Sequence, residues 1–300
     1  MSKQKIVPGL WFDNEAQEAA RFYTSLFKNS DIRETAHYSE AGQEVHGQEP
    51  GGVMTVEFAL DGFRLTAING GPIFKFNPSI SFVVTRPMDE VDALWEELAQ
   101  DGSVLMPLQA YPFNEKYGWV ADRYGLSWQL SAGDESTSPI IPSLMFVGDQ
   151  AGQAEAAINF YTSVFSDSEV GDISRYPAGQ EPEKEGAVTF GPFSLSGQSF
   201  AAMDSAQRHD FFFNEAISFL VNCEDQAEVD YFWEKLSAVP ESEQCGWLKD
   251  KFGVSWQIVP TALSELLADA DRAKSDRVMK AMLKMKKLDI AEIQAAADNS

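Results

Sequence analysis

A thirteen-residue segment that occurs twice constrains this chain more than any other feature. Residues 118–130, GWVADRYGLSWQL, return as residues 246–258, GWLKDKFGVSWQI, and the two copies are identical at seven positions. Tryptophan occurs only seven times in the chain, so two Trp pairs with the same spacing are not an accident of composition. The chain therefore contains an internal repeat.

Each copy of the segment is predicted to form a β-hairpin, because an Asp and a Gly bracket a tight turn. In the second strand Leu126, Trp128 and Leu130 alternate with Ser127 and Gln129. Successive side chains of a strand point to opposite faces. The Leu and Trp face is predicted to pack under helices, and the Ser and Gln face is predicted to be the polar side of the sheet.

The similarity between the two halves extends well beyond this hairpin. Residues 6–12, 22–27 and 74–82 have matching segments at 140–146, 160–165 and 211–219. Strands are predicted at 6–12, 32–38, 53–60 and 63–69, with a helix after the first strand that Asp13 or Asn14 can cap. A second helix has apolar residues at i, i+3, i+4 and i+7 from Val91 to Leu98. The order β-α-β-β-β, twice in each repeat, predicts an α+β fold with helices on one face of curved sheets.

The repeats suggest a division of the chain into parts. We predict one domain over residues 1–132, a polar linker over 133–139, a second domain over 140–260 and a helical tail over 261–300. The two domains would form a pseudo-dimer within one chain, and whether the modules stay in their own repeat or are exchanged is left open, as is further homo-oligomerisation. In the tail, Thr261 can cap a short helix, and an amphipathic helix is predicted from Val278 to Met285. Its polar face, with Lys280, Lys284, Lys286 and Lys287, is predicted to lie against the protein's own acidic surface, the alternative being a docking site.

Composition limits the partners. With 23 Lys and Arg against 46 Asp and Glu, the net charge is −23, which repels nucleic acid and anionic membrane surfaces. The start of the chain has no apolar stretch of signal-peptide length and no later run approaches a membrane span, so we expect a cytoplasmic protein. Cys223 and Cys245 stand opposite Arg86 and Tyr117 in the repeat, which favours free thiols.

Several motifs together resemble a known family. They are FYxSxF at 22–27, FxFNxxISF at 74–82, DxxWExL at 92–98, CGWLKDKFGVSWQIVP at 245–260 and VMKAMLKMKKLDI at 278–290. This set closely resembles the PhnB-like family of the vicinal oxygen chelate superfamily, which includes glyoxalases, bleomycin resistance proteins and extradiol dioxygenases. The family is often labelled 3-demethylubiquinone-9 3-methyltransferase-like. The resemblance covers residues 6–131 and 140–260 and implies tandem glyoxalase-like domains, each of two βαβββ modules that curl into a cup around a ligand or metal.

The resemblance also implies where a metal would bind. Metal enzymes of the superfamily carry His or Glu ligands on the first, fourth, fifth and eighth strands. The matching positions here are Val7, Asn69, Ser79 and Gln129 in the first repeat, and Ile141, Asp204, Ala216 and Gln257 in the second. Aliphatic side chains donate no lone pair, and a transition metal needs three or four N, O or S donors. His37, His46 and His209 fall in other places of the repeat, so we expect no metal and no cofactor.

A set of polar and aromatic residues remains that could line a small-molecule pocket. Amide and hydroxyl groups in a mostly apolar wall suit a small organic ligand. The predicted ligand-binding residues are Trp11, Asn69, Phe76, Asn77, Ser81 and Gln129 in the first repeat, and Met145, Asp204, Phe213, Asn214, Ser218 and Gln257 in the second. The alternative is that the Ser and Gln side chains satisfy one another within the fold.

Three functions compete at this point. The first is a protein that binds a small aromatic or oxidised organic ligand without chemistry. The second is a metal-dependent lyase, isomerase or dioxygenase, which the missing ligands disfavour. The third is a methyltransferase, as the family label suggests, but the sequence has no Gly-rich loop between a strand and a helix. Whether the protein is an enzyme is left open, and the residues favour a binding protein.

Overall fold

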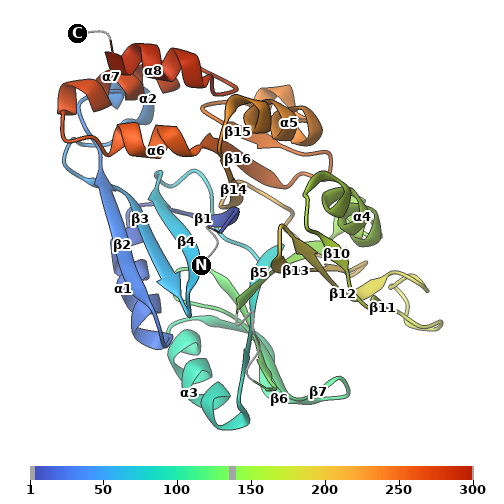
Figure 1. Cartoon of the computed structure of the whole chain (residues 1–300). Helices are drawn as coiled ribbons and strands as arrows, with labels where there is room; N and C mark the ends of the chain where they lie inside the picture. Colours follow the sequence, from blue (N-terminus) through green and yellow to red (C-terminus); the bar gives the residue numbers. More distant parts are fainter. Residues whose placement is uncertain (1–3, 135–139, 299–300) are drawn as a thin grey trace.

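The computed structural model describes residues 4–134 and 140–298 of the chain. Over these residues the chain forms two β-sheets, with helices packed on one face of each sheet and a helical tail at the end (Figure 1). The α+β fold predicted from the sequence is confirmed. Within the described parts, no helix is long and apolar enough to cross a bilayer.

The elements follow the predicted order. The first repeat contains β1 (Ile6–Phe12), α1 (Ala16–Leu26), β2 (Asp31–His37), α2 (Gln43–His46), β3 (Val53–Leu60), β4 (Phe63–Asn69), β5 (Ile80–Arg86), α3 (Met88–Ala99), β6 (Ser103–Tyr111), β7 (Asn114–Ala121) and β8 (Ser127–Ala132). The second contains β9 (Ile140–Phe146), the 3₁₀ turn η1 (Gly148–Gln150), α4 (Ala154–Val164), β10 (Glu169–Val170), β11 (Ser174–Arg175), β12 (Val188–Leu195), β13 (Gln198–Asp204), β14 (Ile217–Cys223), α5 (Gln226–Leu236), η2 (Pro240–Ser242), β15 (Trp247–Lys249) and β16 (Ser255–Pro260). The tail contains α6 (Thr261–Leu267), α7 (Arg272–Met282) and α8 (Ile290–Asp298). The strands predicted at 53–60 and 63–69 are confirmed, and the one predicted at 32–38 begins and ends one residue earlier.

Each sheet combines halves of both repeats. Sheet 1 has the strand order β15-β16-β14-β1-β4-β3-β2, and sheet 2 has the order β10-β12-β13-β9-β5-β8-β7-β6, with β11 beside β12. The halves join through antiparallel pairs, β1 with β14 and β5 with β9. Of the two arrangements that the sequence leaves open, the structure therefore has the one in which modules are exchanged between the repeats.

Aromatic side chains form the core between the helices and the sheets. Trp128 and Trp256 are 0% and 1% exposed. Trp128 packs against Tyr23 of α1 and against Phe27, which directly follows α1, with ring centroids 5.4 and 5.7 Å away. The prediction that this strand face packs under helices is confirmed.

A buried aspartate at the turn of each repeated hairpin ties the two sheets together. Asp122 accepts hydrogen bonds from the Tyr23 hydroxyl at 2.7 Å, the Trp128 indole at 2.9 Å and two backbone amides of its own turn. Tyr23 follows a strand of sheet 1, whereas Asp122 belongs to a hairpin of sheet 2. Asp250 makes the same contacts with Tyr161 and Trp256 in the second repeat.

The start of helix α1 differs from the sequence prediction, and α4 begins in the same way. Neither Asp13 nor Asn14 caps α1, and instead Asn69 Oδ1 accepts the Ala16 amide proton at 2.9 Å. Asp204 does the same for Ala154 at 3.0 Å. The reason is the parallel pairing of the first and fourth strands of each module, which brings the end of the fourth strand beside the start of the helix. A cap distant in sequence replaces the local one.

The tail lies across one end of sheet 1, between α2 and β15 (Figure 1). Its second helix runs from Arg272 to Met282, so it begins and ends earlier than the helix predicted from Val278 to Met285. Thr261 begins α6 but makes no capping hydrogen bond through its side chain. Lys286 and Lys287 lie in the following turn and pair with Glu243 and Asp230 at 3.3 and 2.5 Å. For these two lysines the prediction that the basic side faces the protein's own acidic surface is confirmed.

We expect Tyr161→Phe to lower the free energy of unfolding by about 1–3 kcal/mol, because it removes one partner of a buried carboxyl. Urea denaturation followed by tryptophan fluorescence measures this change. The control is Tyr231→Phe, which removes a hydroxyl that is partly exposed and donates only to the neutral Val164 carbonyl, so it should cost less, about 0.5–1 kcal/mol. Equal effects of the two substitutions would contradict the role of Asp250.

The buried aspartates also predict a pH dependence. Burial raises the pKa of Asp250 above the ordinary value of 3.8, and hydrogen bonds from Tyr161 and Trp256 oppose this shift. A carboxyl whose pKa is raised in the folded state contributes stability that is complete below its unfolded pKa and is lost as pH rises through the folded pKa. We expect the stability of the wild type relative to Asp250→Asn to fall as pH rises from about 4, and to level off above the folded pKa. Urea titrations of both proteins between pH 4 and 8 test the sign, and a rising difference would refute it.

Candidate functional site

The polar faces of the two sheets each carry a Gln–Ser pair at their centre. Gln129 donates to Ser81 Oγ at 2.6 Å, and Gln257 donates to Ser218 Oγ at 2.9 Å. The pairs form because β8 runs parallel to β5, and β16 parallel to β14. The two Gln side chains are only 3% and 7% exposed. The structure therefore places in contact the Gln and Ser residues that the sequence prediction assigned to one site.

At the centre of sheet 2 neighbouring side chains form hydrogen bonds with these polar groups. The Tyr117 hydroxyl donates to Gln129 Oε1 at 2.7 Å, and the Trp119 indole donates to Ser127 Oγ at 2.7 Å. Burial raises the pKa of Tyr117, so this phenol remains a donor at physiological pH. Gln129 therefore has a protein partner for both ends of its carboxamide, as expected of a structural residue.

The centre of sheet 1 keeps two unpaired oxygen atoms. Cys245 replaces Tyr117, and Gln257 Oε1 has no hydrogen-bond donor among the described residues. Trp247 lies edge-on to Trp11, with ring centroids 6.0 Å apart, instead of bonding to the serine. Ser255 Oγ is buried with no partner. A buried polar atom without a partner costs about 1–3 kcal/mol, and this cost applies to Ser255 Oγ. Gln257 Oε1 is not among the fully buried unpaired atoms, so it keeps contact with the space outside the sheet face.

Close packing holds the floor of this site. A Cβ atom added to Gly9 would lie 2.8 Å from Ser218 Oγ and 3.0 Å from Gln257 Nε2. A side chain at this position would require the Gln257 carboxamide or the Ser218 hydroxyl to shift. In sheet 2 the same position is Ser143, whose hydroxyl is also buried without a partner. The two centres therefore share the Gln–Ser pair and differ in everything around it.

The rim of sheet 1 is aromatic on one side and charged on the other. Trp11 packs edge-on against Phe74 at 5.2 Å, and its indole donates to the Gly71 carbonyl at 2.8 Å. Lys249, which stands opposite Ser255 in the strand register, pairs with Glu215 at 2.8 Å. The matching positions around sheet 2 are Met145, Ala121 and Pro78. Sheet 1 thus offers aromatic rings and an ion pair where sheet 2 has apolar side chains.

The remaining predicted site residues make other contacts. Asn69 and Asp204 face the helices and hold the starts of α1 and α4. Phe76 and Phe213 pack against Phe12 and Phe146, each at 5.1 Å. Asn77 and Asn214 link the two repeats, donating to the backbone carbonyls of Phe212 and Lys75 at 3.0 and 2.9 Å. Their ligand-binding role remains a prediction, and the contacts account for them as parts of the fold.

The prediction from sequence did not include four residues of sheet 1: Cys245, Trp247, Lys249 and Ser255. A signal for two of them was present in the repeat, because Cys245 stands where Tyr117 does and Lys249 where Ala121 does. Positions at which two copies of one segment differ in chemistry are the ones that can differ in function. The orientation of Trp247 toward Trp11 depends on the exchange of modules, and the hairpin alone does not contain that information.

The donor atoms around Gln257 do not fit a transition metal. Its neighbours across the strands are Leu220 and Trp247, and the nearby oxygen donors are the hydroxyls of Ser218 and Ser255. Neutral amide and hydroxyl oxygens are poor ligands for the ions that thiolate, imidazole and carboxylate groups bind. Over residues 4–134 and 140–298, no cluster of three or more His, Cys, Asp or Glu has a metal-binding arrangement. We therefore derive no chemistry through a metal at this site.

Comparison with known proteins identifies the family. A model of the family described as 3-demethylubiquinone-9 3-methyltransferase matches residues 4–131 and 138–259. The chain belongs to this family. A solved structure described as a putative 3-demethylubiquinone-9 3-methyltransferase, PhnB protein, from Bacillus cereus is 41% identical over 43% of this chain and all of its own length, with a TM-score of 0.40. A search of curated proteins returned no match.

The fold is glyoxalase-like over most of the chain. Glyoxalase I from Zea mays covers 90% of this chain and 97% of its own length, with a TM-score of 0.57 at 10% identity. A V278E mutant of the same enzyme gives a TM-score of 0.55 at 12% identity. At such identities the likeness shows the fold alone. It confirms the tandem glyoxalase-like architecture of this family member.

The difference between the two sheets predicts that the same Ser→Ala substitution affects stability differently in each. Ser127→Ala leaves the partly buried Trp119 indole without an acceptor and should destabilise the protein by about 1–2 kcal/mol. Ser255→Ala removes a hydroxyl that has no partner, so it should be neutral or slightly stabilising. Thermal and urea denaturation of the two variants, each without added ligand, provide the comparison. Similar losses in both variants would show that Ser255 has a partner in solution.

Proposed function

We propose that this protein binds a small organic molecule at the centre of sheet 1, on the face that carries Gln257. The observation that carries the proposal is the pair of unpaired oxygens, Gln257 Oε1 and Ser255 Oγ. Their counterparts in sheet 2 are paired by Tyr117 and Trp119. A ligand that donates a hydrogen bond to Gln257 would supply the partner that the protein itself supplies in sheet 2.

The chemistry of the rim limits the ligand. The edge-on rings of Trp11, Trp247 and Phe74 favour a flat, aromatic or conjugated body. The carboxamide of Gln257 is neutral, so it selects a polar group such as a hydroxyl or an N–H without needing a buried counter-charge. A small aromatic or oxidised molecule with at least one donor meets both conditions, and we propose that it is bound without being transformed.

The two enzymatic alternatives have less support. A metal-dependent reaction needs donors that the residues around Gln257 do not provide. Methyl transfer, the activity in the family's description, has no corresponding cofactor-binding motif, since the sheets are built from βαβββ modules rather than a doubly wound sheet with a Gly-rich loop. The net charge of −23 further supports a neutral or cationic small molecule over nucleic acid or anionic lipid.

Native mass spectrometry of the purified protein, combined with a thermal-shift screen of small aromatic compounds, tests the proposal. We expect a bound species or a stabilising compound for the wild type, and loss of that binding in Gln257→Leu with stability within about 1 kcal/mol of the wild type. Gln129→Leu is the matched control, and its folded fraction should still bind. Binding retained in Gln257→Leu would refute the site. Unfolding of that variant by several kcal/mol would identify Gln257 as a structural residue.

A further inference from the structure

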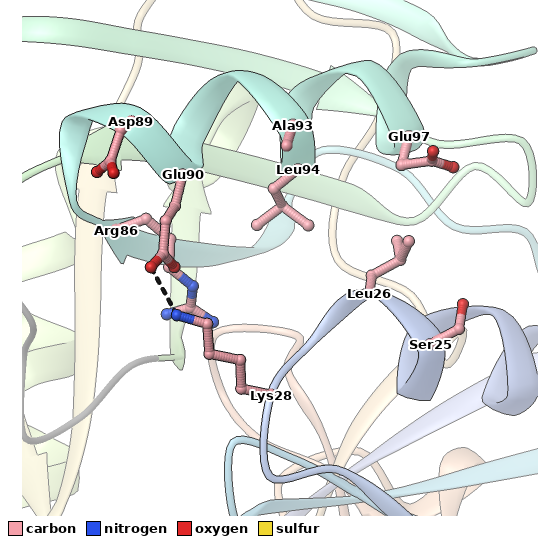
Figure 2. Close-up of a pocket in the computed structure, with 9 residues that line it drawn as sticks. All are labelled: Ser25, Leu26, Lys28, Arg86, Asp89, Glu90, Ala93, Leu94 and Glu97. Atoms are coloured by element: carbon pink, nitrogen blue, oxygen red, sulfur yellow. Dashed lines mark hydrogen bonds and ion pairs between the residues drawn. The ribbon is translucent and has the colours of Figure 1, made fainter.

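A groove lies between two helices of the first repeat, away from the centre of sheet 1. The end of α1 and the outer side of α3 enclose a groove of about 580 Å³. Figure 2 shows Leu26 and Leu94 facing one another across it, with Glu90, Ala93 and Glu97 along α3. A groove of this volume is within the range of small-molecule sites.

The second repeat shows what fits such a groove. Helices α3 and α5 align so that Val91 and Leu98 match Val229 and Leu236, which places Tyr231 at the position of Ala93. The Tyr231 hydroxyl donates to the Val164 carbonyl, at the end of α4, at 2.8 Å. The matching carbonyl in the first repeat is that of Leu26, a residue that lines the groove. The groove of the first repeat is therefore the space that a phenol side chain fills in the second.

The charges differ between the repeats in a complementary way. In the second repeat Lys235 lies one helical turn after Tyr231, with its ammonium 6.0 Å from the centroid of the ring. The residue at that position in the first repeat is Glu97. The cations that line the groove already have partners, since Lys28 pairs with Glu90 and Arg86 with Asp61. Glu97 has no ion pair among the described residues, so a negative charge in the first repeat replaces a positive one in the second.

We propose that this groove binds a phenol that carries a protonated amine. The ring takes the place of the Tyr231 ring, and the hydroxyl donates to the Leu26 carbonyl as Tyr231 donates to that of Val164. The ammonium pairs with Glu97, which stands where the protein has its own ammonium in the second repeat. Ring, hydroxyl and cation are thus all supplied by the chain in one repeat and by the ligand in the other.

Isothermal titration calorimetry of the intact protein with tyramine, a phenol with a protonated ethylamine arm, tests the proposal. We expect saturable binding with a stoichiometry of one. Phenethylamine, which lacks the hydroxyl, and p-cresol, which lacks the amine, should each bind about tenfold more weakly or worse, as expected for the loss of one polar contact of about 1.4 kcal/mol. Absence of saturable tyramine binding would overturn the proposal.

Variants locate the site. Ala93→Tyr supplies the ring from the chain, as the second repeat does, and should abolish tyramine binding while leaving the thermal unfolding temperature unchanged. Glu97→Lys should weaken tyramine binding at least tenfold but leave p-cresol unaffected. Gln257→Leu should bind tyramine as the wild type does, which separates this groove from the site on sheet 1. Tyramine binding that survives Ala93→Tyr would place the ligand elsewhere and overturn the assignment.

Discussion

The fold depends on one buried carboxylate in each repeat. Asp122 and Asp250 begin the turn of the repeated hairpin and accept a hydrogen bond from a tyrosine of the first helix of the same repeat. That helix packs on a strand of the other sheet, so each aspartate fixes the distance between two sheets that share no strand. Four hydrogen bonds offset part of the cost of burying the charge. The exchange of modules is what makes this single contact hold the halves of the molecule together.

Duplication allowed the two sheet centres to diverge. Both retain the Gln–Ser pair, but Tyr117 and Trp119 complete it in sheet 2. In sheet 1 the Ser255 hydroxyl is buried without a partner, and Gln257 Oε1 accepts no hydrogen bond from the described residues. A buried polar group that has its hydrogen-bond partners stabilises a fold, and one without a partner costs stability unless another molecule supplies it. The same relation holds for the groove beside α3, where one repeat contains the tyrosine and the other contains a space.

The helical tail adds to this asymmetry, because it bonds to the hairpin of sheet 1 next to Trp247. The Met285 and Lys286 carbonyls accept the backbone amides of Cys245 and Gly246, each at 2.8 Å. Cys245 has a φ of +52°, an unusual conformation for a residue other than glycine. The tail therefore holds the strand end that precedes Trp247, the residue whose ring turns toward Trp11. A segment outside both repeats thus contributes to the difference between their sites.

Much of this protein was determined by its sequence alone. The duplicated hairpin, the period of the apolar residues and the turn residues were enough for the βαβββ order, for the buried faces of Trp128 and Trp256, and for the opposite, polar face of Gln129 and Gln257, because these depend on local geometry. The capping of α1 by Asn69, the exchange of modules and the unpaired state of Gln257 were decided only in the tertiary structure. Each depends on which strands become neighbours. Local sequence patterns do not specify contacts between residues that are far apart in the chain.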